Sequence, residues 1–175
     1  MASDRATQSD ILGAIVQRLR QRVPNCTDAT CFLSDQREPM QWPAGGHICV
    51  TVAAGAGQFD ESMWAGGGWS TLCELVQIHV TVWLRALLDQ PPRTEQALRG
   101  EEGMFSRYKP EILRALLLQR LSDGRLDAWM PVDPSGIGLL RQPLQPLSCS
   151  VPMPEGSGKY VGMSLTFLAM FDWLL

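Results

Sequence analysis

The sequence LCELVQIHVTVWL, at residues 72–84, alternates between two kinds of side chain along its whole length. One set consists of Glu74, Val76, Ile78, Val80, Val82 and Leu84, and the other of Cys73, Leu75, Gln77, His79, Thr81 and Trp83. Successive side chains of a β-strand point to opposite faces, so the pattern predicts a strand with one aliphatic face and one mixed face. Its length exceeds the usual range of about 3–10 residues. We expect the rest of the fold to be built around it.

Two other stretches have helical spacing. Residues 9–23, SDILGAIVQRLRQRV, begin with polar residues that can cap a helix, and Pro24 and Asn25 follow the last turn. The apolar positions of this helix are Ile11, Leu12, Ile15, Val16 and Leu19. Residues 109–121, KPEILRALLLQRL, carry proline in the first turn and a leucine-rich stripe, and residues 122–124 then end the helix. Each stripe is typical of a helix that packs on a core.

The remaining regular stretches favour strands. We expect strands at residues 31–33, at 47–53 (HICVTVA), at 147–151 and at 160–171, where apolar residues again alternate. The order is then helix, strands, helix, strands. It predicts an α+β fold with a mixed, mostly antiparallel sheet and two main helices packed on one face. We expect residues 1–175 to form a single domain, with long loop insertions at about 55–68 and 125–146.

Composition narrows the function classes. The net charge is −3 and the pI is about 5.3, which gives no footprint for broad phosphate contact, so specific nucleic-acid binding is not expected. The five cysteines are irregularly spaced, and no CxxC motif is present. This usage favours reduced thiols in a protein that is made in the cytoplasm. The polar N-terminus does not resemble a signal peptide, and the apolar run at 161–175 is too short to span a membrane. We expect no membrane partner.

No motif in the sequence indicates catalysis. His47 and Cys49 share a face of one strand and His79 lies in another, but structural zinc sites usually show paired ligands close in sequence, so we expect no metal. His79 fits a half-buried polar face instead. Gly55 and Gly57 follow a strand but lack the third glycine and the helix of a dinucleotide fingerprint, and carboxylates follow them. We therefore predict no catalytic residue and no cofactor.

The loop at 55–68 contains the residues that we single out. Its sequence is rich in glycine, and four large side chains lie in it or beside it: Phe59, Met63, Trp64 and Trp69. Aromatic residues are enriched at the centres of protein interfaces, so these four are candidate subunit contacts. Packing into the protein's own core explains the same residues equally well. The sequence leaves both interpretations open.

The layout resembles the tail terminator and neck (head–tail joining) proteins of long-tailed bacteriophages. The resemblance is carried by the helix at 9–23, the strands HICVTVA and LCELVQIHVTVWL around a long loop, the helix KPEILRALLLQRL, and the closing strand KYVGMSLTFLAMFDW. It covers most of the chain but rests on element order and period, without a diagnostic motif. The chain is also longer than a typical terminator, with the extra length at 55–68 and 125–146.

The resemblance implies a structural virion protein of the neck and tail that is not an enzyme. It implies a ring of identical subunits, a hexamer in this family, that caps the tail tube and joins it to the head. The expected partners are further copies of the chain, the tail tube protein and the head–tail connector or stopper proteins, with DNA passing through the ring. Two alternatives stay open: another connector or stopper protein, and a small soluble enzyme or ligand-binding domain with a site between sheet and helices.

Overall fold

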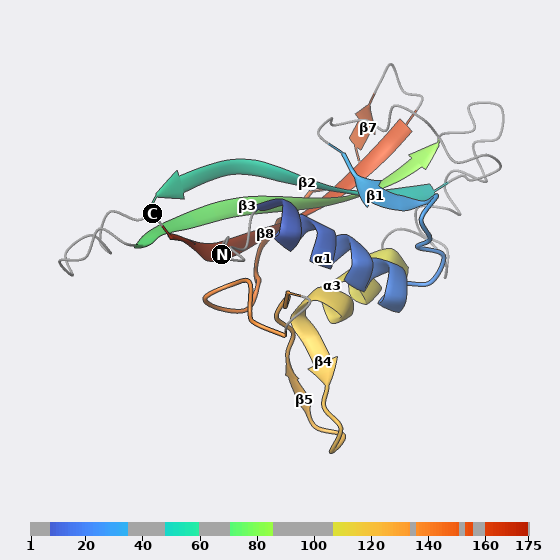
Figure 1. The fold of residues 1–175 in the computed structure, drawn as a ribbon. Coiled ribbons are helices and arrows are strands. Elements are labelled where there is room, and N and C mark those ends of the chain that lie inside the picture. Colours follow the sequence, from blue (N-terminus) through green and yellow to red (C-terminus); the bar gives the residue numbers. More distant parts are fainter. Residues whose placement is uncertain are drawn as a thin grey trace.

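The computed structural model describes residues 8–34, 48–59, 71–85, 107–133, 136–150, 153–155 and 160–174. A sheet of long strands forms one layer, and helices α1 (Gln8–Arg22) and α3 (Lys109–Leu117) form a second layer on one face of it (Figure 1). A small hairpin, β4 (Leu118–Arg120) with β5 (Leu126–Ala128), projects from the helix layer. The predicted α+β class, with a mostly antiparallel sheet and the two helices on one face, is confirmed.

The main sheet has six strands in the described residues. Its order is β1-β2-β3-β8-β6, and β7 also pairs with β8. The strands are β1 (Cys31–Leu33), β2 (Ile48–Phe59), β3 (Thr71–Arg85), β6 (Gln145–Cys149), β7 (Met153–Glu155) and β8 (Tyr160–Leu174). Only β1 and β2 are parallel; every other pair is antiparallel. β3, the stretch that predicted the fold, pairs along its whole length with β8 and lies between β2 and β8.

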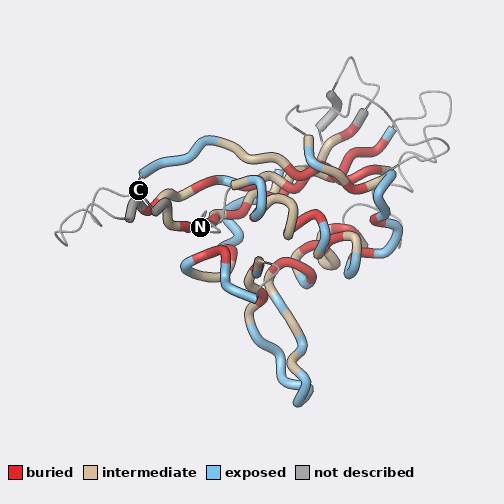
Figure 2. The backbone as a smooth tube through the Cα atoms, viewed as in Figure 1, coloured by how far each residue is buried: buried red, intermediate tan, exposed pale blue. Residues whose placement is uncertain are grey.

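One hydrophobic core lies between the helices and the sheet. α1 contributes Ile11, Ile15, Val16 and Leu19, and α3 contributes Ile112, Ala115 and Leu116, all of them buried. The sheet contributes the aliphatic set of β3 that the alternation identified, from Val76 to Leu84. Figure 2 shows this burial concentrated where helices and sheet meet. α1 ends as expected, because Asn25 just beyond it adopts a left-handed backbone with φ of 63°.

β2 is longer than the sequence predicted. The loop was expected from residue 55, yet β2 continues to Phe59 after a bulge between Ala54 and Gly57. Two glycines make this possible. A Cβ atom on Gly55 would lie 2.5 Å from Nε2 of His79, and a Cβ atom on Gly57 would overlap the carboxylate of Glu74. The glycines therefore let the side chains of His79 and Glu74 on β3 lie close to the backbone of β2. The same glycines are also typical of a loop, which is why the sequence predicted one here.

The helix at 109–121 was predicted too long. α3 ends at Leu117, and Leu118 is already extended, with φ of −127° and ψ of 143°. Residues 118–120 pair with residues 126–128 across a turn in which Gly124 has φ of 86°. The segment expected as a loop at 125–146 accordingly contains β5 and the first residues of β6. The sequence at residues 118–120 is compatible with a helix or a strand, and pairing with residues 126–128 makes it a strand.

Candidate functional site

Of the four candidate contact residues, the structure places one. Phe59 is the last residue of β2, and 54% of its surface is exposed. Met63, Trp64 and Trp69 lie outside the described residues. Phe59 is therefore not a core residue, which favours the contact interpretation at that position.

Phe59 stands at the end of a projection that we call the arm: residues 55–59 of β2 with residues 74–77 of β3. Beyond the bulge, residues 56–59 are all exposed, whereas residues 49–52 are all buried. Phe59 lies directly opposite Glu74, which in turn lies opposite Phe171 of β8. Directly opposite residues share a face, so these three side chains form a row across the sheet. The row lies on the face that carries the helices, with Phe171 buried and Phe59 reaching solvent.

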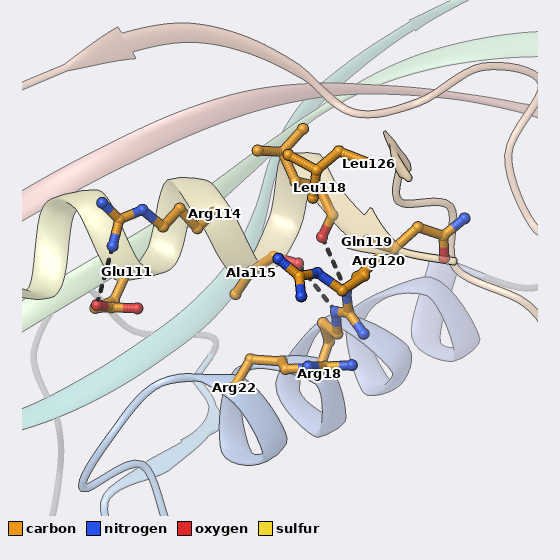
Figure 3. A pocket seen from close by; sticks show the side chains of 9 residues that line it. All are labelled: Arg18, Arg22, Glu111, Arg114, Ala115, Leu118, Gln119, Arg120 and Leu126. Carbon is orange, nitrogen blue, oxygen red and sulfur yellow. Dashed lines mark hydrogen bonds and ion pairs between the residues drawn. The ribbon is translucent and has the colours of Figure 1, made fainter. Parts of the chain in front are cut away.

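A second feature lies where α1, α3 and the β4–β5 hairpin meet. It is a groove with a volume of about 350 Å³, which we call the arginine groove (Figure 3). Its residues are Arg18, Arg22, Glu111, Arg114, Ala115, Leu118, Gln119, Arg120 and Leu126. Four arginines face a single glutamate. The groove is therefore positively charged although the chain as a whole is acidic.

Arg18 holds the groove together. Its Nε donates to the carbonyl oxygen of Ala115 at 3.0 Å and its Nη2 to that of Leu118 at 2.9 Å. The carbonyl group of Ala115 lies in the last turn of α3, where it has no partner within the helix, and that of Leu118 belongs to β4. The guanidinium also lies 5.3 Å from the ring centroid of Trp129, a cation–π distance. Burial, and then the charge of Arg22, lowers the pKa of Arg18, which still stays protonated.

The other arginines are less constrained. Arg114 makes an exposed ion pair with Glu111 at 3.4 Å, of a kind worth little to stability. Arg22 and Arg120 are exposed, and no carboxylate among the described residues pairs with either. In Figure 3 their guanidinium groups and that of Arg18 gather in the centre of the view, beside the side chains of α3. Two cations are thus available to an anionic partner, next to the exposed side chains of Leu118 and Leu126.

The face of the sheet opposite the helices is polar in its middle. His79 Nδ1 lies 3.1 Å from Thr166 Oγ1, and Thr81 donates to Ser164 at 3.2 Å. His79 is half-buried, as the sequence predicted. Farther along, Trp83 Nε1 donates to buried Thr51 at 2.8 Å, and the absence of a side chain at Gly162 leaves room for the indole ring. These are cross-strand pairs that stabilise the sheet.

The five cysteines all lie in the described part of the chain, and none of them forms a disulfide. Cys26 and Cys31 are buried together: the hydrogen bond between their thiols lowers the pKa of Cys26 and raises that of Cys31. Burial raises the pKa of Cys49 to about 12. Within the described residues, no group of three or more histidine, cysteine, aspartate or glutamate side chains could hold a metal ion. His47 lies outside them.

Comparison of the chain with models of protein families gives no match, and comparison with curated proteins gives none either. Within the ranges that the structure describes, no helix has the length and the apolar character needed to cross a lipid bilayer.

Sequence reasoning missed the arginine groove. Arg18 and Arg22 are four residues apart and so lie on one side of α1, a spacing that was visible. Their meeting with Arg120 was not visible, because residue 120 was assigned to a helix and lies in a strand. The groove forms where β4 leaves the end of α3 next to α1.

Proposed function

We propose that this chain is a structural protein of the neck and tail of a long-tailed bacteriophage. In this proposal it is a tail terminator whose copies form a ring, capping the tail tube and joining it to the head. The proposal rests on the resemblance in element order. It is supported by an α+β fold in which α1, β2, β3, α3 and β8 follow one another in the order that the resemblance needs.

One observation carries the assembly part of the proposal. In the arm, residues 56–59 of β2 leave the core while staying paired with β3, and the strand ends on an aromatic side chain that is 54% exposed. Exposing Phe59 contributes nothing to the stability of an isolated protomer. Covering it with a neighbour would bury apolar surface worth about 25 cal/mol per Å². An exposed aromatic side chain in this position favours a protein that functions as a subunit of an assembly.

The test is the mass and the shape of the purified protein. Size-exclusion chromatography with light scattering, followed by negative-stain microscopy, should show a ring-forming oligomer. A stable monomer at every concentration tested would overturn the proposal. If that monomer turned over or bound a small molecule, the alternative of an enzyme or ligand-binding domain would be correct.

A gene deletion in the virus separates a terminator from other neck proteins. A ring that caps the growing tube should limit its length, so particles without a terminator should carry tubes of irregular, increased length. Loss of a stopper or another connector should instead leave tails of normal length that are not joined to heads. Electron micrographs of the deletion lysate distinguish the two outcomes.

The contact residues predicted from the sequence give an independent test. Trp64→Ala and Trp69→Ala should each impair ring formation more than folding, because interface aromatics carry a large share of binding free energy. The measurements are oligomer mass and thermal unfolding of the same preparations. Variants that assemble fully, or that fail to fold, contradict the contact role of these tryptophans.

A further inference from the structure

The end of the arm and the arginine groove are complementary in chemistry. The arm ends on exposed Phe59, and the sequence continues with Asp60 and Glu61, two carboxylates in succession. The groove offers cations of Arg22 and Arg120 that have no carboxylate partner among the described residues, beside exposed Leu118 and Leu126. We propose that Phe59 and the acidic pair after it, from one protomer, dock into the arginine groove of the next protomer. This inference rests on the proposed ring.

The geometry of one protomer favours a contact between two copies. Arg18 and Arg22 lie in the C-terminal half of α1, toward the side of the molecule where β2 begins, whereas Phe59 is where β2 ends, at the far tip of the arm (Figure 1). The two surfaces therefore lie at different ends of the protomer. A contact between different patches of identical subunits is head-to-tail, and it makes a ring when the rotation closes.

The lining of the groove argues for a peptide with aromatic and acidic side chains rather than for nucleic acid. A phosphate backbone would leave Leu118 and Leu126 without apolar contact. An aromatic ring can cover the two leucines and meet a guanidinium face, and the carboxylates can pair with the cations. The same chain carries both the groove and a segment with these side chains, at the end of the arm.

Charge reversal tests the pairing directly. One variant carries Arg22→Glu with Arg120→Glu, and the other carries Asp60→Lys with Glu61→Lys. Each alone should weaken self-association on the order of tenfold or more, measured by light scattering across a concentration series. An equimolar mixture should assemble again, because each reversed surface then meets its complement in alternating order. The variant with all four substitutions should also assemble.

Controls separate the contact from general effects of charge and size. Arg85→Glu changes an exposed arginine at the far end of β3, and it should leave association unchanged. Phe59→Ala should weaken association on the order of tenfold, whereas Ile137→Ala, at a residue 65% exposed, should not. Circular dichroism and thermal unfolding check that each protomer is folded. If a charge reversal unfolds the protein, Arg22→Gln with Arg120→Gln replaces it and should weaken association in the same direction.

The outcomes are distinct. If the wild type forms a ring and both charge-reversal variants assemble normally, the docking is overturned and the proposed function stands. Reversals that dissociate but do not reassemble on mixing show that the two surfaces do not meet each other, and they also overturn it. A monomeric wild type overturns both proposals. Retention of labelled duplex DNA by the wild type, lost in the arginine variant while the ring persists, assigns the groove to nucleic acid instead.

Discussion

The helix-backed part of the sheet and the arm are built from the same two strands and meet opposite environments. Val50 and Val52 of β2 are almost completely buried, whereas Phe59 of the same strand is 54% exposed. The bulge between Ala54 and Gly57 separates the two regions. Strand pairing of β2 thus continues where its own side chains have left the core. The comparison shows that residues 56–59 of β2 are held by strand pairing with β3 and remain exposed, whereas Val76 of β3 beside them is still part of the core.

The largest effect should come from the helix-backed region. Leu19→Ala removes a fully buried side chain of α1 and should lower the free energy of unfolding by about 2–5 kcal/mol, since it leaves a cavity. Phe59→Ala, in the arm, should change it by no more than about 0.5 kcal/mol. Guanidinium denaturation of both variants measures the difference. Equal losses would mean that the arm belongs to the core.

A smaller effect is expected at the boundary between the two regions. Gly55→Ala places a Cβ atom 2.5 Å from His79 Nε2 and should destabilise the protein by about 1–3 kcal/mol. Adding His79→Ala should recover part of that loss, because the clash partner is removed. Gly13→Ala in α1 is the control. Nothing lies within 4 Å of its new methyl group, and it should stabilise the helix by about 0.5–1 kcal/mol.

Within the arginine groove, the hydrogen-bonded Arg18 can be compared with the exposed Arg120. Arg18→Met keeps an unbranched stem but loses the hydrogen bonds to Ala115 and Leu118, which should cost about 1–2 kcal/mol and speed hydrogen exchange in the β4–β5 hairpin. Arg120→Met should leave stability within about 0.5 kcal/mol. Chemical denaturation and hydrogen exchange measure both. An unchanged hairpin in Arg18→Met would show that Arg18 does not anchor it.

The last effect is absent at neutral pH and appears only at alkaline pH. Burial raises the pKa of Cys49 from 9.0 to about 12, so the folded state binds this proton more tightly than the unfolded state. Stability from this group is complete below about pH 9 and is lost as the pH rises toward 12. Cys49→Ala should flatten the decline of unfolding free energy in that window. The same slope in both proteins would assign the decline to other groups.

Much of the fold was accessible from the sequence because its signals are local. The alternation at 72–84 and the apolar spacing of residues 11–19 each report on one element, and both elements were confirmed. The end of β2 was missed because glycine suits a loop and a crowded strand equally, and only His79 and Glu74 across the pair distinguish them. Phe59 was singled out as a candidate contact from its residue type, whereas its exposure required the structure.

The sequence by itself determined where the two main helices and the long strands lie, since side-chain periodicity is a property of neighbouring residues. Only the tertiary structure decided that residues 118–120 form a strand, and that Arg18 and Arg120 line one groove. The hydrogen bond from Arg18 to Leu118 joins residues 100 positions apart. Contacts at such separations depend on how the layers pack, and no local pattern encodes them.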